Sequence, residues 1–237
     1  MTESICHKLQ LWAKRYNCRD FIHQDPIQVP HTHLHDTLQD LEISAFLTAY
    51  LSFGNRKQII KNACRLDEIM QHAPFQYVMS GKWQSDFPEA NPNSFYRMLS
   101  FAKMNGIFAQ IFSIYSEYGS MEDAVSAQSG ERPFNKLCNL FGISDKSPQK
   151  KMNMFLRWMV RNDGIVDFGT WKKLAPSDLL IPLDTHVSQM AFKIGLTEKE
   201  TYSLKTAEKI TQSLAEIFPG DPCLGDFALF GYGVEND

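Results

Sequence analysis

Two lysines at the start of a predicted helix are the residues of this sequence best suited to chemistry. Lys150 and Lys151 precede apolar residues that recur at helical spacing, namely Met152, Phe155, Leu156 and Met159. Ser147 and Pro148 suit the cap and the first residue of this helix, so we expect both lysines in its first turn. Unpaired amide groups make that end of a helix electropositive, which disfavours an ammonium and favours a neutral, nucleophilic amine.

An aspartate at the start of a second predicted helix is the other half of the candidate site. Pro182 holds the residue before it extended, and Asp184 follows shortly after. Apolar residues then recur at helical spacing at Val187, Met190, Ala191 and Ile194. Asp184 is therefore expected to cap this helix. Taken alone, the aspartate is an ordinary cap and the lysines are a solvated basic pair, and both interpretations stay open at this point.

The two segments together resemble the helix-hairpin-helix superfamily of DNA glycosylases, in its endonuclease III and 8-oxoguanine glycosylase branches. The resemblance lies in a lysine that opens one helix and a Leu-Asp-Thr-His-Val segment, residues 183–187, that opens another. The amino-acid sequences of residues 153–161 and 181–187 are also similar to those of an uncharacterised bacterial family related to those enzymes. The resemblance implies an all-α, two-lobed fold with a cleft between the lobes.

The same resemblance assigns roles to individual residues. Lys150 would attack the sugar C1′, with Lys151 as the alternative nucleophile, and Asp184 would stabilise the charge that develops as the base leaves. The implied partner is double-stranded DNA with a damaged base, and the chemistry needs no metal or organic cofactor. Asn55 or Arg56 would enter the gap left by the extruded base, unless these residues only end and solvate a turn.

Two departures from the superfamily pattern bear on these expectations. Its Gly-x-Gly hairpin is absent, and only Gly142 can supply part of such a DNA-binding turn. The separation between the lysine and the aspartate is also longer than in endonuclease III-type enzymes, although archaeal 8-oxoguanine glycosylases are similarly stretched. The chain ends soon after Gly233, so the four-cysteine iron–sulfur cluster of endonuclease III is not expected.

Composition describes an ordinary globular protein rather than a simple nucleic-acid binder. The chain has 237 residues, of which 43% are hydrophobic and 22% charged, and its net charge is −3. Nucleic-acid-binding domains are usually basic, so any phosphate contact must come from a local stripe. The cations that follow the candidate lysines are Arg157, Arg161, Lys172 and Lys173.

Sequence features also indicate a compartment and an assembly state. The five cysteines are scattered without a Cys-x-x-Cys motif, which indicates reduced thiols. No apolar run approaches about 18 residues, and the first residues lack the apolar core of a signal peptide. We therefore expect a cytoplasmic monomer without a membrane partner.

A histidine-rich segment near the N-terminus is the one concentrated set of metal-capable side chains. His31, His33 and His35 alternate, and in an extended segment they would share one face that suits a transition metal. Pro26 and Pro30 make the segment a loop, where such histidines are more often solvated. We therefore expect no metal site and keep these three residues as weak candidates.

The remaining pattern predicts helices throughout. We expect helices over about 38–53, 59–70 and 203–218, two helices joined at Asn105-Gly106, and a loop over 162–180. The aromatic residues of this central region are expected to form core rather than a base-stacking strip. One lobe should combine residues 1–35 with 175–237, and the other should span 36–174 and carry the lysines.

Two other functions remain open alongside a DNA glycosylase. One is a catalytically inactive nucleic-acid-binding module of the same fold, which the missing hairpin glycines and the acidic balance favour. The other is a metal-dependent protein that uses the histidine segment. Alanine at Asp184 would leave the binding of an inactive module unchanged, and metal analysis of the purified protein would reveal a metal-dependent one. The distance between the Lys150 amine and the Asp184 carboxylate is the most informative single structural measurement.

Overall fold

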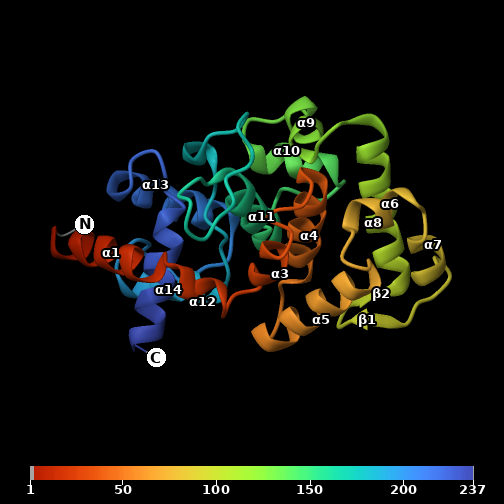
Figure 1. Ribbon diagram of the computed structural model, residues 1–237. Coiled ribbons are helices and arrows are strands. Elements are labelled where there is room, and N and C mark those ends of the chain that lie inside the picture. The colour runs from red at the N-terminus through yellow and green to blue at the C-terminus, as the bar shows by residue number, and fades with distance from the viewer. Residues whose placement is uncertain (1–2, 237) are drawn as a thin grey trace. The chain divides into compact units, whose positions relative to one another are not determined.

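Helices make up most of the structure. The computed structural model describes residues 3–236 and the side chains of residues 3–233. Over these residues it contains fourteen α-helices, one 3-10 helix and a single two-stranded hairpin (Figure 1). The all-α class is confirmed, although the hairpin was not predicted. None of the helices in this part of the chain is long and apolar enough to cross a membrane.

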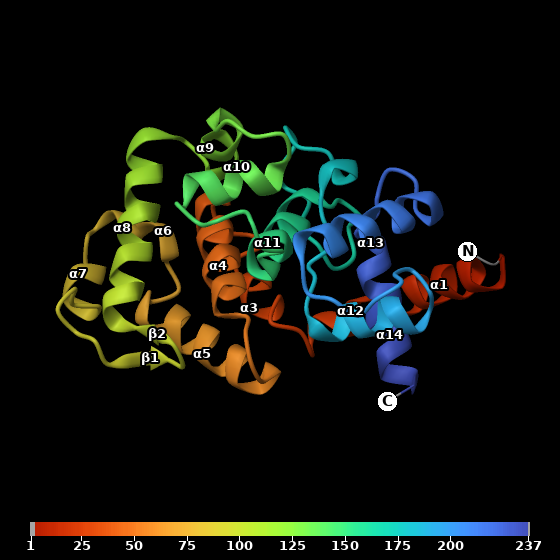
Figure 2. The same cartoon turned by 180° about the vertical axis from the view of Figure 1, so that it is seen from behind.

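The chain folds into two compact units, Asp25–Ala127 and the combination of Met1–Gln24 with Gln128–Asp237. The second unit contains α1 (Glu3–Tyr16), α2 (Arg19–Ile22), α10 (Pro133–Leu140), α11 (Lys150–Val160), the 3-10 helix Pro176–Asp178, α12 (Thr185–Lys193), α13 (Leu204–Ile217) and α14 (Leu224–Asn236). Helix α1 packs against α14, which it crosses in both views of the ribbon (Figures 1 and 2). The hydrophobic core of this unit joins α1, α12, α13 and α14 through Leu9, Val187, Ile210 and Ala228.

The boundaries of these units differ from those expected, because residues 128–174 belong with the two termini and residues 25–35 belong with the other unit. Ion pairs provide the physical reason. Arg157 of α11 pairs with Asp226 of α14, and Arg161 pairs with Asp221, whose carboxylate lies 2.8 Å away. The side-chain amide of Asn17 also donates to Asp163 over 2.6 Å, which joins the N-terminal segment to the loop after α11. These long-range contacts are not visible in local sequence patterns.

The unit Asp25–Ala127 is built around α4 (Leu38–Leu51) and α8 (Phe101–Glu117). It also contains α3 (Gln28–His31), α5 (Arg56–Ile69), α6 (Pro74–Met79), α7 (Trp83–Asp86), β1 (Ser94–Tyr96), β2 (Leu99–Ser100) and α9 (Met121–Ala127). Helix α4 is buried on nearly all sides, so its sequence is apolar without a polar stripe. Strands β1 and β2 pair antiparallel.

Helix α8 runs unbroken through Asn105-Gly106, so the predicted junction there is wrong. Ser100 caps the helix by accepting a hydrogen bond from the amide of Lys103. The side chain of Asn105 donates to the carbonyl of Phe87 over 2.7 Å, so it serves a tertiary contact rather than a turn. Gly106 is exposed with open space around it, and tertiary packing outweighs its weak helix propensity.

Aromatic side chains form the core beside α8, as the sequence pattern predicted. Phe87 and Phe108 are fully buried, and their ring centroids lie 5.2 Å apart. Trp83 stacks on Phe108, and Phe95 contacts Phe87 edge to face. A buried carboxylate completes this unit: Glu42 accepts hydrogen bonds from the hydroxyl of Tyr115 and from the first amide of α9.

Candidate functional site

Lys150 and Asp184 meet in the folded chain. The Nζ atom of Lys150 lies 2.7 Å from Oδ2 of Asp184, and each side chain is 33% exposed. Lys150 is the first residue of α11, and Asp184 is the cap of α12, so the contact joins the N-terminal ends of two helices. An amine and a carboxylate that are 34 residues apart in sequence therefore form one partly solvated pair.

The start of α11 differs in detail from the prediction. Ser147 and Pro148 lie before the helix, and Gln149 occupies the cap position with left-handed dihedral angles of φ 36° and ψ 59°. The side chain of Gln149 donates to the carbonyl of Ser144 and to the hydroxyl of Ser147, which closes this turn on itself. The predicted capping role of Ser147 is therefore wrong. The placement of Lys150 and Lys151 in the first turn is confirmed.

Asp184 uses its two oxygens for two purposes. Its Oδ1 accepts the amide of Val187 over 2.8 Å, which is the helix cap predicted from sequence, while Oδ2 faces Lys150. Burial would raise the pKa of this carboxyl, but the Lys150 ammonium and the Val187 amide outweigh burial and hold the pKa below its usual value. Asp184 is therefore ionised at neutral pH. The ordinary cap and the charged partner are the same residue.

Tyr202 is a component of the site that sequence reasoning missed. It lies close enough to both members of the pair for their charges to act on its phenol, and its side chain is 54% exposed. Burial and the charge of Asp184 raise the pKa of this phenol. The preceding residue is fixed to α12, because the hydroxyl of Ser188 donates to the carbonyl of Thr201. Tyr202 lies in a short polar connection without periodicity, so no sequence signal points to it.

Behind the pair lies a buried network of charges. Arg157 follows Lys150 by seven residues, so it projects from the same face of α11 and reaches Asp226. Burial raises the pKa of Asp226, and the charge of Asp184 adds to this effect while Arg157 and Lys150 oppose it. Asp226 is therefore close enough to influence the charge of the candidate site.

The predicted basic stripe after the lysines does not exist as a surface. Arg157 is 4% exposed and Arg161 is 1% exposed, because both lie among aspartates and over the ring of Phe227. Lys172 and Lys173 are exposed. The two arginines therefore have a structural role, because they neutralise carboxylates that would otherwise be buried without an opposite charge.

A close helix contact positions the first turn of α12. A Cβ atom on Gly233 of α14 would lie 2.2 Å from Nε2 of His186, so only glycine lets the two helices approach this closely. His186 lies two residues after Asp184, and its charge would act on that carboxyl. The glycine near the end of the apolar C-terminal run therefore has a packing role beside the site.

Gly142 ends helix α10. Its φ of 61° is left-handed, its amide donates to the carbonyl of Asn139, and the amide of Ile143 donates to the carbonyl of Cys138. This pair of hydrogen bonds is a Schellman motif, in which glycine avoids the strain of the left-handed conformation. Gly142 is exposed, and the connection to α11 covers residues 141–149. Its contact with DNA stays a prediction.

Asn55 and Arg56 begin a helix instead of ending one. The Oδ1 atom of Asn55 accepts the amides of Lys57 and Gln58, so Asn55 caps α5, and Arg56 is the first residue of that helix. Helix α4 already ends at Leu51. Both residues are exposed on a turn, and their entry into a duplex stays a prediction.

The three candidate histidines do not share a face. His31 ends α3 (Gln28–His31), and His33 and His35 lie in the turn that follows, so the segment is not extended. His33 is buried, and its two ring nitrogens contact Asp36 and Asp67, each over 2.9 Å, whereas His35 is exposed. Among the described residues, no group of three or more His, Cys, Asp or Glu side chains is arranged to hold a metal ion.

Comparison with known proteins identifies a family for this chain. A family model described as "Protein of unknown function (DUF2400)" matches residues 25–235, which include Lys150, Asp184 and Tyr202. No curated protein and no solved structure matches the chain. Since the family model covers most of the sequence, this chain belongs to the DUF2400 family.

Proposed function

We propose that this protein is a DNA glycosylase and AP lyase of the helix-hairpin-helix superfamily. Its substrate would be double-stranded DNA that carries a damaged base of the 8-oxoguanine kind. The observation that carries the proposal is the 2.7 Å contact between the amine of Lys150 and the carboxylate of Asp184. These are the two residues that the resemblance to the superfamily assigns to the reaction.

The properties of Asp184 suit an electrostatic role. Its pKa is held low, so it is a weak proton acceptor at neutral pH but a permanent negative charge. A target nucleotide rotated out of the stack would place its sugar beside this charge. As the bond between C1′ and the base breaks, positive charge develops on the sugar, and Asp184 would stabilise it. The carboxylate therefore assists departure of the base without taking a proton.

Lys150 would then form the covalent intermediate. Its ammonium first loses a proton, and the lone pair adds to C1′ while the base leaves with the electrons of the glycosidic bond and takes up that proton. Opening of the sugar breaks the bond between C1′ and O4′. One proton moves from the nitrogen to O4′, which leaves a protonated imine. This Schiff base permits subsequent cleavage of the DNA strand.

Borohydride trapping tests this proposal, since it reduces the imine to a permanent link between protein and DNA. We expect trapping on a duplex that carries 8-oxoguanine, and on one that carries an abasic site. Lys150→Gln should abolish trapping. Lys151→Gln is the matched control, because it removes the neighbouring charge from the same helical turn, and it should retain most of the trapping.

The variants also separate the proposed enzyme from its alternatives. Asp184→Asn should slow base release by about two to three orders of magnitude. Trapping that depends on Lys151 instead of Lys150 would move the nucleophile by one residue and keep the mechanism. Absence of trapping and of base release over a panel of damaged bases, with DNA binding retained, would instead favour the inactive binding module.

A further inference from the structure

We infer that a cationic surface formed by the β1–β2 hairpin and most of α5 binds duplex DNA, with Met98 entering the base stack. We call this the hairpin surface, and it consists of residues 54–66 and 94–103. The inference rests on the proposed function for the identity of its polyanionic partner. It assigns DNA binding to a part of the chain that contains neither Lys150 nor Asp184.

The charge of the hairpin surface is the first observation. Its two segments contain six of the seven Lys and Arg residues between positions 25 and 127, and none of the chain's 27 Asp and Glu residues. The six cations are Arg56, Lys57, Lys61, Arg65, Arg97 and Lys103. Because the whole chain has a net charge of −3, this concentration is a local reversal of sign. Such a patch attracts the phosphate backbone of a nucleic acid.

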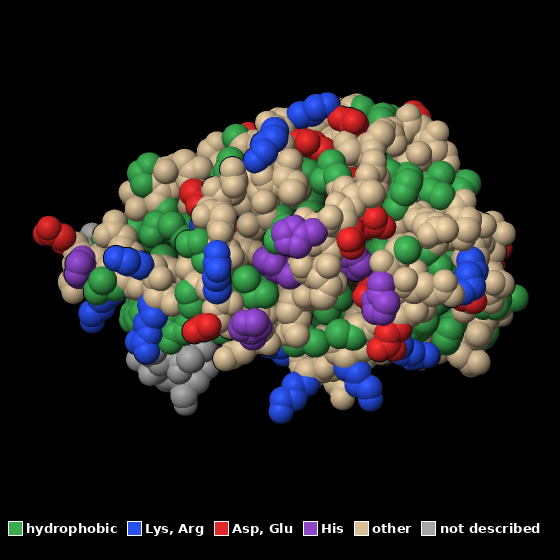
Figure 3. All heavy atoms as spheres, viewed as in Figure 1, with side chains coloured by type: hydrophobic (Ala, Val, Ile, Leu, Met, Phe, Trp, Pro, Cys, Tyr) green, Lys and Arg blue, Asp and Glu red, His purple; other side chains and the backbone are tan. Residues whose placement is uncertain are grey.

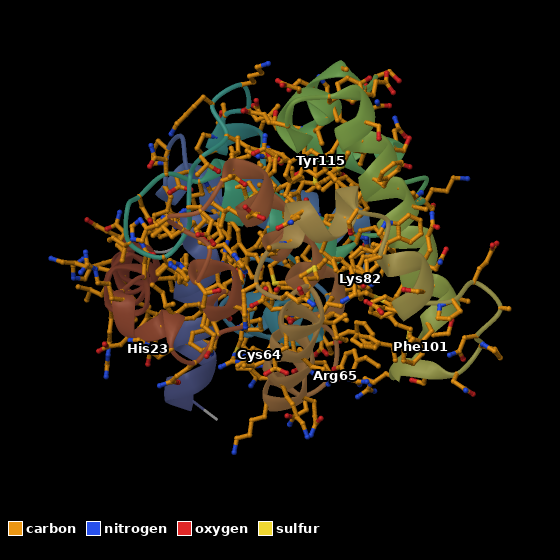
Figure 4. The ribbon with its side chains drawn as sticks, turned by 45° about the vertical axis from the view of Figure 1, so that its right-hand side comes forward. His23, Cys64, Arg65, Lys82, Phe101 and Tyr115 are labelled. Atoms are coloured by element: carbon orange, nitrogen blue, oxygen red, sulfur yellow. The ribbon has the colours of Figure 1, made fainter. Side chains whose placement is uncertain are left out.

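The fold brings the two segments together, although about 40 residues separate them in the sequence. The hydroxyl of Tyr96 donates to the carbonyl of Phe53 over 2.7 Å. The guanidinium of Arg65 lies 4.9 Å from the ring centroid of Phe95, whose ring in turn contacts Phe101. Arg65 and Phe101 are labelled in Figure 4. Figure 3 shows Lys and Arg side chains projecting at the edge of the molecule that carries α5.

The turn before α5 shows how closely the hairpin packs against it. Gly54 has a φ of 95°, and a Cβ atom added to it would lie 2.6 Å from Nη1 of Arg97. Arg97 itself has a left-handed φ of 51°, which makes the tight turn between the strands. Glycine at position 54 therefore permits both the backbone conformation and the approach of the arginine.

Met98 is the apolar centre of this surface. With 68% of its surface exposed, it is the most exposed large hydrophobic residue among those described. The ammonium of Lys103 donates to its carbonyl over 3.1 Å, so the tip of the hairpin is tethered to α8. Proteins that bend DNA insert Met or Leu side chains between base pairs while flanking Arg and Lys hold the backbone. The tip of the hairpin has this composition.

Met98 also suits the wedge role better than Asn55. The carboxamide oxygen of Asn55 is committed to two amides of α5, and its withdrawal would cost a helix cap. The side chain of Met98 does not cap a helix. A single apolar residue among cations fits one base step, whereas a membrane-binding helix requires a wide apolar face. The partner is therefore assigned as duplex DNA.

Binding of the full-length chain to a fluorescein-labelled duplex tests the inference. The duplex carries one tetrahydrofuran abasic analogue, and anisotropy is measured over a series of salt concentrations. Lys57→Gln/Lys61→Gln should weaken binding and reduce the slope of log K against log salt by up to about two, since each phosphate contact contributes about 0.9. Lys82→Gln is the matched control, because Lys82 is the one other Lys or Arg residue of this unit, and it should behave as wild type.

Met98→Ala should weaken binding to the abasic-analogue duplex by about tenfold, the scale of a lost stacking contact, and affect an intact duplex less. Leu34→Ala, at another exposed apolar residue of the same unit, should change neither affinity. Equal melting temperatures must accompany these comparisons. Binding by the lysine variant with the wild-type salt slope, or no DNA binding by the wild-type chain, would overturn the inference.

Trapping separates this result from the fate of the proposed reaction. If wild-type protein binds DNA with the expected salt dependence but is never trapped, the hairpin surface stands and the glycosylase proposal falls. If the protein is trapped, but the Met98 and lysine variants bind and are trapped as wild type, the glycosylase proposal stands and the hairpin surface falls.

Discussion

Substitutions at Asp184 can separate its structural role from its proposed chemical role. The residue caps α12 through Oδ1 and pairs with Lys150 through Oδ2. Asparagine retains an oxygen that can cap the helix but carries no charge, whereas alanine removes both functions. Comparison of Asp184→Asn with Asp184→Ala therefore isolates the ion pair from the cap.

The exposure of the pair sets the magnitude of the stability effect. Both side chains are 33% exposed, and ion pairs that are partly solvated contribute at most about 1 kcal/mol. A lost cap costs about 1 kcal/mol more. Asp184→Asn should thus lower the free energy of unfolding by under about 1 kcal/mol, and Asp184→Ala by about 1–2 kcal/mol. Loss of an electrostatic stabiliser raises a reaction barrier by about 3–4 kcal/mol. A large kinetic effect beside a small stability effect would mark a role in the reaction.

Urea unfolding of Lys150→Gln, Asp184→Asn and the double variant measures the coupling energy of the pair directly. The contribution of Asp184 should be present above its unfolded pKa of about 3.9 and should disappear as pH falls through its lower folded pKa. A coupling energy above about 3 kcal/mol would refute this reasoning, because such values belong to buried pairs. The pair would then be a structural element, and lost activity would say little about chemistry.

Three further outcomes follow from buried charges, each measured by urea unfolding. Glu42→Gln should destabilise the protein by about 2 kcal/mol, because an amide cannot accept all the hydrogen bonds that the buried carboxylate accepts, and exposed Glu68→Gln serves as the control. Arg161→Met should cost about 3–5 kcal/mol, because it removes one of the two guanidinium groups that neutralise the buried Asp167 and also the partner of Asp221. Burial opposes protonation of His33, but its carboxylate neighbours outweigh burial and raise its pKa, so its contribution should be complete below about pH 6.5 and lost as pH rises through the folded pKa. His33→Gln should therefore cost more stability at about pH 5.5 than at about pH 9.

Local patterns predicted much of the candidate site because they act within a few residues. The spacing of apolar residues located α11, α12 and α13, and the aspartate before Thr185 was identified as a cap. These signals depend on helix periodicity and on hydrogen bonds within one turn, both of which involve residues close together in the chain. Residue type and spacing therefore placed Lys150 and Asp184 at the starts of two helices, whereas the resemblance to the glycosylase superfamily selected them as a candidate pair.

Tertiary contacts decided the features that the sequence did not predict. Helix α8 continues through Asn105-Gly106 because Asn105 has a partner in a distant segment. Arg157 and Arg161 look like surface cations in sequence, but aspartates from α14 and two loops draw them into the interior. Tyr202 has no periodic context, so only the fold shows its position beside Lys150.

The start of α11 is where local preference and fold disagree most, and this disagreement coincides with the candidate site. A helix normally begins with acidic residues, yet α11 begins with two lysines and follows a left-handed glutamine without a side-chain cap. The opposite charge comes from Asp184, the cap of another helix, and buried ion pairs between α11 and α14 hold the helix in place. Proteins retain locally unfavourable features where surrounding structure compensates for them, and such features concentrate at functional sites. Lys150 is placed against its helix dipole, is packed from behind and is 33% exposed, and these features support the proposed reactive role of its amine.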